Sequence, residues 1–252
     1  MRVYLAVTPD HLEEALRCTA RVAHVAYRID ETGMLACAEL PAKIRGGIMV
    51  LSDGDGCTLQ DISTLCSAVC RECEVRGFGA VTADFEQPKN EERCAFLRAL
   101  CENLRKMGRV LYVPECYGCD VPGAMVLICT AVSGGSLRVR LQEARRTFGE
   151  RVALDLQRLR MEFPLPCPCG EGRNLQREEL EKFLAEEPKV FFSEELCARY
   201  FVRLSDCEPS LVLFDDADTL RRKLRLAQEL GITAAFVMFP EVEDIRSELW
   251  RK

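Results

Sequence analysis

Residues 78–86 read FGAVTADFE, an apolar run that ends with two carboxylates two positions apart. Side chains alternate along a β-strand, so Asp84 and Glu86 are predicted to point to the same side. In a (β/α)8 barrel that side faces inward, and the carboxyl ends of the strands open onto the catalytic mouth. Carboxylates that converge there raise one another's pKa and can act as general acid and electrostatic partner. The spacing alone fits a solvated strand end that caps the next helix equally well.

Short β-rich runs alternate with helical stretches along the chain, as a parallel sheet with crossover helices requires. The ten predicted strands are residues 3–7, 22–27, 47–51, 78–85, 110–113, 124–129, 152–156, 200–204, 210–214 and 232–238. A barrel of this kind has eight strands, so two runs must merge, form hairpins or lie outside it. Residues 91–107 and 220–230 carry apolar side chains at helical spacing, and a glycine that can end a helix follows each.

These patterns predict one α/β domain over residues 1–252, a (β/α)8 TIM barrel with a parallel sheet and outer helices. The length is close to the roughly 250 residues typical of that fold. We find no linker, low-complexity segment or repeat of fixed period that would divide the chain. Residues 163–172, rich in proline and glycine, are expected to form a long loop.

Composition narrows the possible partners and the compartment. The net charge of −6 argues against nucleic acid, because proteins that bind the phosphate backbone usually present a basic face. No apolar run approaches the roughly 18 residues of a transmembrane helix, and the N-terminal residues lack the pattern of a secretory signal. We therefore expect a cytoplasmic protein that binds neither nucleic acid nor membranes. The fifteen cysteines would remain reduced there.

The spacing of the cysteines is compatible with two metal sites, and also with a purely structural role for these side chains. Cys66, Cys70 and Cys73 have the C-x3-C-x2-C spacing with which radical S-adenosylmethionine enzymes hold an iron–sulfur cluster. The same spacing, i, i+4 and i+7, is that of a buried helix face, which we predict here. Residues 116–119 and 167–169 could supply four thiolates to zinc, although the second spacing is one residue shorter than usual. We predict no metal site and no cofactor, and the iron–sulfur enzyme remains an alternative.

The end of the 78–86 segment resembles glycoside hydrolase family 18. In that family the fourth barrel strand ends Asp-Gly-x-Asp-x-Asp-x-Glu, and in the spore cortex-lytic branch it often ends Asp-Phe-Glu. Four further segments are similar to segments that follow this strand in members of the family. Ala124–Ala131 is similar to a strand with Leu-Met-Thr-Tyr, and Ser133–Gly135 is similar to a glycine-rich loop. Val152–Pro166 is similar to a strand that ends aromatic-Leu-Pro, and Val212–Leu220 with Lys223 and Gly231 is similar to the segment before the last strand. The resemblance implies a (β/α)8 barrel that hydrolyses N-acetylhexosamine glycans.

By the same resemblance, Glu86 is the general acid/base and Asp84 orients the substrate's 2-acetamido group. That group is the nucleophile in this family, an exception to the scheme with two catalytic carboxylates. Asp53, Tyr117 and Gln157, near the ends of predicted strands, are assigned to substrate binding.

The sequence departs from the family pattern at four positions. The first two acidic positions of the motif are Gly79 and Thr82. The tyrosine that holds the acetamido oxygen falls on Ala131, and the tryptophan at the floor of the sugar site falls on Met238. Loss of one such donor commonly lowers the rate by about 100- to 1000-fold. A hydrolase of peptidoglycan or chitin fragments is therefore weighed against an inactive barrel that binds a glycan or a protein partner.

Overall fold

The computed structural model describes residues 1–18, 21–38, 40–41, 44–54, 56–59, 61–167, 170–204 and 209–249. The chain divides into two compact units, and each is assembled from separated stretches of sequence. The first comprises Met1–Ile128, Ala144–Asp155 and Ile232–Pro240, and the second comprises Cys129–Glu143, Leu156–Gly231 and Glu241–Lys252. Whether the two behave as one domain over residues 1–252 stays a prediction.

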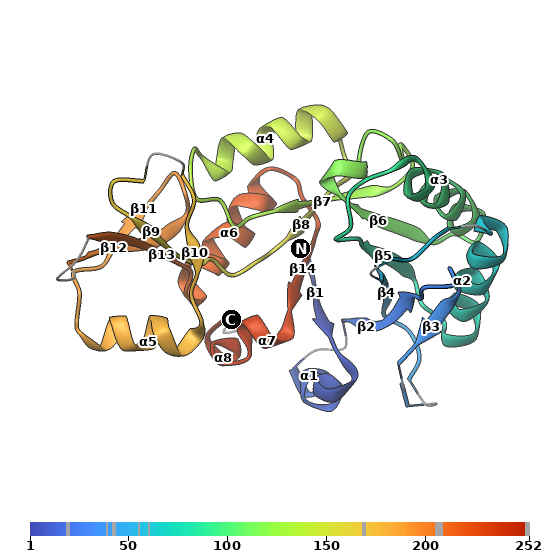
Figure 1. Ribbon diagram of the computed structural model, residues 1–252, viewed down its shortest axis with the longest axis horizontal. Coiled ribbons are helices and arrows are strands. Elements are labelled where there is room, and N and C mark those ends of the chain that lie inside the picture. The colour runs from blue at the N-terminus through green and yellow to red at the C-terminus, as the bar shows by residue number, and fades with distance from the viewer. Residues whose placement is uncertain are drawn as a thin grey trace. The chain divides into compact units, whose positions relative to one another are not determined.

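Eight parallel strands close into a barrel within the first unit, which contains all of them except the last residue of β7 (Figure 1). In chain order they are β1 (Arg2–Val7), β2 (Val22–Ile29), β4 (Ile48–Asp53), β5 (Ala80–Asp84), β6 (Val110–Pro114), β7 (Met125–Cys129), β8 (Val152–Asp155) and β14 (Ala234–Met238). β1 pairs with both β14 and β2, which closes the sheet, and the short β3 (Leu35–Cys37) adds to β2 in the antiparallel sense. The predicted (β/α)8 fold class is confirmed.

Helices occupy the connections between these strands. They are η1 (Pro9–His11) and α1 (Leu12–Cys18) after β1, α2 (Ile62–Arg76) before β5, α3 (Glu91–Lys106) and η2 (Glu115–Tyr117) on either side of β6, α4 (Leu137–Phe148) before β8, and α7 (Phe239–Val242) with α8 (Arg246–Leu249) after β14. The caps explain the ends of α3: the Asn90 side chain accepts a hydrogen bond from Arg93 N–H, and Gly108 takes the left-handed conformation. This helix is the one predicted over residues 91–107.

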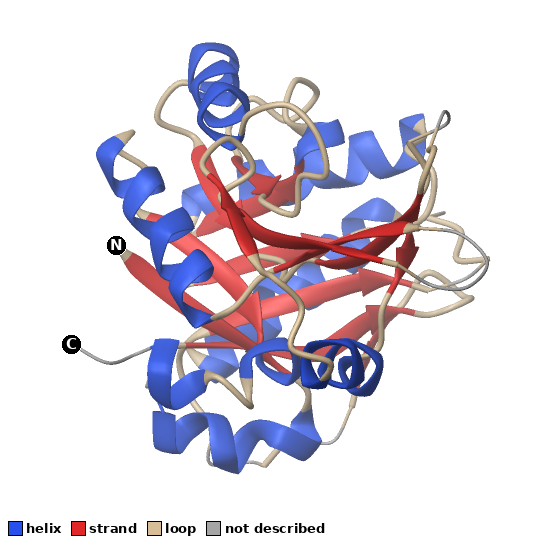
Figure 2. Ribbon diagram, turned by 90° about the vertical axis from the view of Figure 1, so that its left-hand side faces the viewer, coloured by secondary structure: helices blue, strands red, loops and turns tan. Residues whose placement is uncertain are grey.

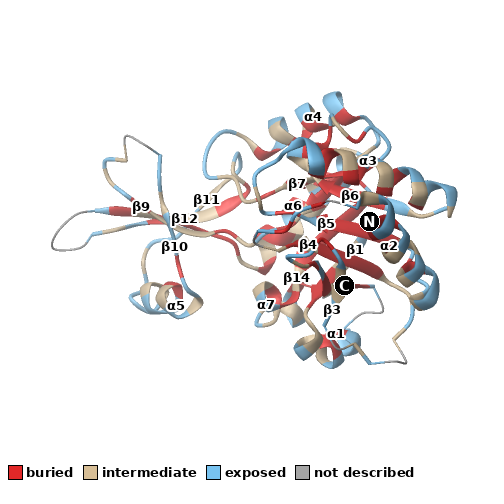
Figure 3. Cartoon of the chain, turned by 45° about the vertical axis from the view of Figure 1, so that its right-hand side comes forward, coloured by how far each residue is buried: buried red, intermediate tan, exposed pale blue. Residues whose placement is uncertain are grey.

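The strands of the first unit are largely buried (Figure 3), and alternation along them divides their side chains between two apolar clusters. Inside the barrel, the ring of Phe236 stacks on Tyr4 at 5.2 Å and meets Tyr112 edge-on at 4.8 Å between centroids. Outside it, strand residues such as Leu51 and Val81 pack with the buried faces of α2 and α3. Residues of β5 therefore face the interior and the helices in turn.

The second unit contains a five-stranded antiparallel sheet (Figure 2). Its strands lie in the order β10 (Arg173–Asn174), β9 (Arg160–Pro164), β13 (Ser210–Phe214), β12 (Ala198–Arg203) and β11 (Phe191–Ser193), and its helices include α5 (Arg177–Ala185) and α6 (Ala217–Glu229). β12 and β13 are the two predicted strands in excess of eight, and they form an antiparallel pair outside the barrel.

The cysteines at positions 66, 70 and 73 lie on α2, as the helical spacing predicted. Cys66 and Cys73 are buried free thiols, and Cys70 is half-buried. Burial raises the pKa of both Cys66 and Cys73 to about 12, so these thiols stay protonated. Cys116 and Cys119 are exposed, and Cys169 lies outside the described residues.

Within the described ranges, none of the helices combines the length and the apolar character needed to cross a membrane. The cytoplasmic location stays a prediction.

Candidate active site

Two exposed carboxylates mark the carboxyl end of β5, the fourth parallel strand in chain order. Asp84 is the last residue of the strand, and Glu86 follows two positions later. Phe85, between them, is buried against Phe96 and Tyr117 on the helix side. Since Ala80 of the same strand packs inside the barrel, alternation puts Asp84 on the inner side of its mouth, and Glu86, just beyond the strand end, is close enough to interact electrostatically with Asp84.

The surroundings of Asp84 favour its protonated form. Its pKa is raised first by the protein around it, which displaces water, and then by the Glu86 and Asp53 carboxylates. A side chain can be exposed and still be poorly solvated when it lies in a hollow, because protein replaces part of its hydration shell. The mouth therefore combines solvent access with a high concentration of negative charge.

Asp53, the last residue of β4, fixes the backbone beside Glu86. Its carboxylate accepts a hydrogen bond from the Glu86 N–H at 2.8 Å and another from Arg93 Nε at 2.9 Å. The side chains of Asp53 and Arg93 are only 1% and 10% exposed. Because such a buried, hydrogen-bonded ion pair resists rearrangement, it holds the segment from which the Glu86 side chain projects. The contact predicted between Asp53 and substrate stays a prediction.

Tyr117 lies in η2 and is completely buried in the layer that packs against α2 and α3. Burial is the main reason that its pKa is raised to about 12. Its hydroxyl has no hydrogen-bond partner among the described residues. Asp53 and Tyr117 thus lie behind the mouth, on the side of Phe85, and the role of Tyr117 in binding substrate stays a prediction.

A row of polar side chains crosses three neighbouring strands at the level of Asp84. The strand register pairs Arg28 of β2 with Ser52 of β4, and Ser52 with Asp84. A bulge in β2 between Val25 and Tyr27 shifts the alternation by one residue, so Arg28 comes to the inner side. Arg28 could not be predicted at this position from the sequence, because a regular strand would direct its side chain outward.

The floor of the mouth is less polar. Thr82 lies two residues before Asp84 on β5, so its side chain is on the same side of the strand. It is buried, and its hydroxyl has no hydrogen-bond partner in the part of the chain that the structure describes. Met238, at the position of the family's tryptophan, is half-buried beside the interior cluster. Among the described residues, no group of three or more His, Cys, Asp or Glu side chains could hold a metal ion.

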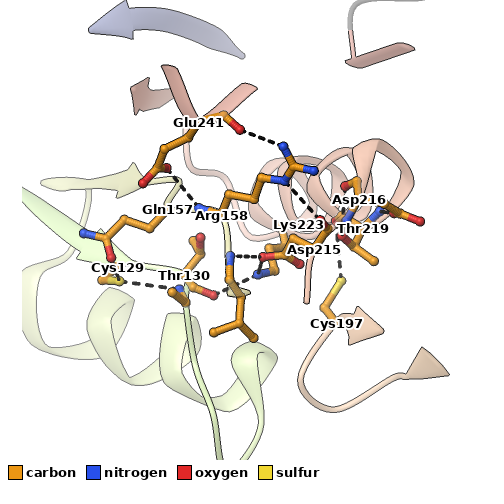
Figure 4. A network of polar contacts seen from close by, with 12 residues as sticks. Cys129, Thr130, Gln157, Arg158, Cys197, Asp215, Asp216, Thr219, Lys223 and Glu241 are labelled. Atoms are coloured by element: carbon orange, nitrogen blue, oxygen red, sulfur yellow. Dashed lines mark hydrogen bonds and ion pairs between the residues drawn. The ribbon is translucent and has the colours of Figure 1, made fainter. Parts of the chain in front are cut away.

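In the second unit, Gln157 follows the end of β8 and is exposed (Figure 4). Its Oε1 accepts a hydrogen bond from Cys129 Sγ at 3.3 Å. Ala131, at the position of the family's tyrosine, is packed against an apolar cluster that includes Leu159 and Phe163. The assignment of Gln157 to substrate binding stays a prediction.

The same unit contains a buried ion pair, also seen in Figure 4. Lys223 of α6 donates to Asp215 at 2.6 Å and to the Thr130 carbonyl at 3.1 Å, and Leu159 N–H donates to Asp215 at 2.9 Å. Both charged side chains are 0% exposed. Because no substrate can reach this lysine and its ammonium already has two acceptors, we assign the pair to the stability of the fold.

Comparisons with known proteins agree with this architecture. No protein-family model and no curated protein matches the sequence. Solved structures are similar in fold: a chitinase from Chromobacterium violaceum ATCC 12472 has a TM-score of 0.72 at 15% identity, with 98% of this chain and 97% of that chain covered. The spore cortex-lytic enzyme SleL of Bacillus cereus has a TM-score of 0.69 at 15% identity, with 99% and 74% covered.

A glycoside hydrolase family 18 chitinase from Cycas revoluta, solved with (GlcNAc)3, has a TM-score of 0.64 at 12% identity over all of both chains. At such identities the likeness establishes the fold. The chain has the barrel architecture of chitinases and spore cortex-lytic enzymes, and the resemblance stated from its sequence is supported.

Proposed function

We propose that this protein is a glycoside hydrolase that acts on N-acetylhexosamine-containing glycans, such as peptidoglycan or chitin fragments, with retention of configuration. The observation that supports the proposal is that Asp84 and Glu86 are exposed carboxylates at the carboxyl end of the fourth parallel strand. Their spacing and their place on the fourth strand match the family motif. The likeness in fold to chitinases supports the same reaction.

In the proposed reaction, Glu86 donates its proton to the glycosidic oxygen as the bond between that oxygen and the anomeric carbon breaks. The carbonyl oxygen of the substrate's own 2-acetamido group forms the new bond to the anomeric carbon, which gives an oxazolinium ion. Asp84 stabilises the positive charge on the acetamido nitrogen. A water molecule then transfers a proton to Glu86 and attacks the anomeric carbon, which reopens the ring. The hydrogen bond from the Glu86 N–H to Asp53 keeps the acid in position.

A barrel that binds a glycan without cleaving it is the second candidate. Ala131 and Met238 favour it, because they supply neither a hydroxyl to the acetamido oxygen nor an aromatic face for a sugar ring. The retained Asp84 and Glu86 favour the hydrolase.

Replacement of Glu86 by Gln separates the two candidates, because it keeps the shape of the side chain and removes the transferable proton. With a chromogenic N-acetylglucosamine oligosaccharide, kcat should fall by about 100-fold or more while binding persists. Glu92→Gln is the matched control, since Glu92 is an exposed carboxylate on α3. If the wild-type protein binds the oligosaccharide but cleaves it no faster than Glu86→Gln, the binding module replaces the hydrolase.

A further inference from the structure

Two exposed thiols lie on the turn that follows β6, where residues 116–119 read CYGC. Two overlapping hydrogen bonds shape this turn, which begins with η2. The Gly118 N–H donates to the Glu115 carbonyl at 2.9 Å, and the Asp120 N–H donates to the Tyr117 carbonyl at 3.0 Å. Each bond joins residues three positions apart, and Gly118 itself has right-handed helical dihedral angles. The backbone therefore keeps 3-10 geometry from the first cysteine to the second.

This geometry brings the two cysteines within bonding range. A 3-10 helix has three residues per turn and rises about 2.0 Å per residue, so side chains three positions apart lie on the same side. Their Cα atoms are then about 6 Å apart, and a disulfide requires a separation of about 4.4–6.8 Å. Cys116 and Cys119 have this spacing. A bond between their Sγ atoms therefore requires side-chain rotation and leaves the backbone of the turn in place.

The inner side of the same turn is firmly packed. Tyr117 is completely buried, and its ring meets that of Phe85 edge-on at 6.2 Å between centroids. At Gly118, a Cβ atom would lie 2.6 Å from Cε1 of Phe148, so only glycine fits there. Because these contacts hold the turn, the two thiols stay on its outer side, within reach of each other and of solvent.

A second pair with the same spacing shows what accessibility adds. Cys70 and Cys73 lie three positions apart on α2, but Cys73 is completely buried, and burial raises the pKa of its thiol to about 12. The protein around Cys116 also raises the pKa of that thiol, while the Lys89 ammonium lowers it. Cys116 and its partner are exposed, so the thiolates that form as the pH rises meet a dissolved oxidant.

We propose that Cys116 and Cys119 are a redox-active dithiol that a small disulfide, such as oxidised glutathione, converts to an intramolecular disulfide. One cysteine thiolate attacks a sulfur of the oxidant, which gives a mixed disulfide and releases one glutathione thiolate. The other cysteine thiolate attacks the protein sulfur of the mixed disulfide, which closes the bond and releases the second glutathione thiolate. Two electrons pass from the protein to the oxidant, and the two glutathione thiolates take up the two cysteine protons. This property is independent of the proposed hydrolase.

The test incubates the full chain with oxidised glutathione, blocks the remaining thiols with iodoacetamide and maps the cysteines by peptide mass spectrometry. The wild-type protein should lose both thiols together and contain a bond between Cys116 and Cys119, which dithiothreitol reopens. In Cys119→Ser the second step is impossible, so glutathione should stay attached to Cys116. Cys18→Ser is the matched control, because Cys18 is also an exposed thiol but lies on α1, and the bond should form as in the wild type.

A second measurement asks whether the folded turn promotes the bond. The ratio of bonded protein to mixed disulfide at Cys116 should be roughly 10-fold or more higher in the native protein than in urea, because the fold holds the reacting groups in place. Equal ratios would contradict the proposal. So would wild-type protein in which each of the two cysteines keeps a glutathione, binds a third cysteine or does not react.

Discussion

Two pairs of charged residues in this molecule differ in what surrounds them. Asp215 and Lys223, in the second unit, are completely buried and lie 2.6 Å apart with opposite charges. Asp84 and Glu86, in the barrel, are exposed and carry the same charge. Neither of the latter forms a hydrogen bond or ion pair through its side chain with any described residue.

In both pairs the protein raises the pKa of an aspartate. Burial raises the pKa of Asp215, with Lys223 acting in the opposite direction, whereas burial, Glu86 and Asp53 all raise the pKa of Asp84. A raised pKa alone therefore does not separate a structural carboxylate from a catalytic one. The difference lies in the partner, because a carboxylate with a fixed cation is already neutralised, while Asp84 remains available to a ligand.

The largest effect on stability is expected when the buried pair is broken. Asp215→Ala leaves the Lys223 ammonium buried without its counter-charge and should lower the free energy of unfolding by about 3–5 kcal/mol. Urea unfolding followed by circular dichroism measures this. The double variant Asp215→Ala/Lys223→Met should recover most of the loss, and a double variant as unstable as Asp215→Ala would show that the charge pair is not the cause.

An intermediate loss of stability is expected from a change at Asp53. Like Asp215, Asp53 is buried, but its carboxylate also contacts the Glu86 backbone. Asp53→Asn removes the charge that neutralises Arg93, so the free energy of unfolding should fall by about 1.5–3 kcal/mol. Because the single amide oxygen of Asn can no longer accept fully from both the Glu86 N–H and Arg93 Nε, Glu86 is held less firmly, and kcat should fall more than KM changes. Leu97→Ala, which disturbs the buried face of α3, provides the comparison. If it lowers kcat per folded molecule as much as Asp53→Asn does, Asp53 has no positioning role.

The smallest effect on stability is expected from a change at Asp84, and it is an increase rather than a decrease. Its pKa is raised on folding, so its ionised form lowers the stability of the fold above that pKa, and the penalty disappears as the pH falls below the ordinary value of 3.8. Asp84→Asn should therefore have a slightly higher Tm than the wild type near neutral pH and the same Tm at about pH 3.5, while turnover is impaired. A lower Tm near neutral pH would mean that the Asp84 charge stabilises the fold.

Much of the barrel could be predicted from the sequence, because its strands are short β-rich runs separated by helical stretches. All eight parallel strands coincide with predicted runs. The two runs in excess, 200–204 and 210–214, could not be distinguished from barrel strands, since β propensity is the same for parallel and antiparallel pairs. Only the structure shows that β13 pairs with β9 and that these strands form a separate antiparallel sheet.

The sequence by itself determined the order of strands and helices and the inward direction of Asp84, because both depend on the local period of the backbone. Only the tertiary structure decided which neighbouring polar residues share that mouth. One position of register separates Ser52, on the inner side, from Asp53, whose partner Arg93 lies 40 residues away. A bulge in β2 brings Arg28 inward, and Lys223 meets the Thr130 carbonyl across 93 residues. Bulges, register and distant partners are set by strand pairing and packing, which no local pattern of residues contains.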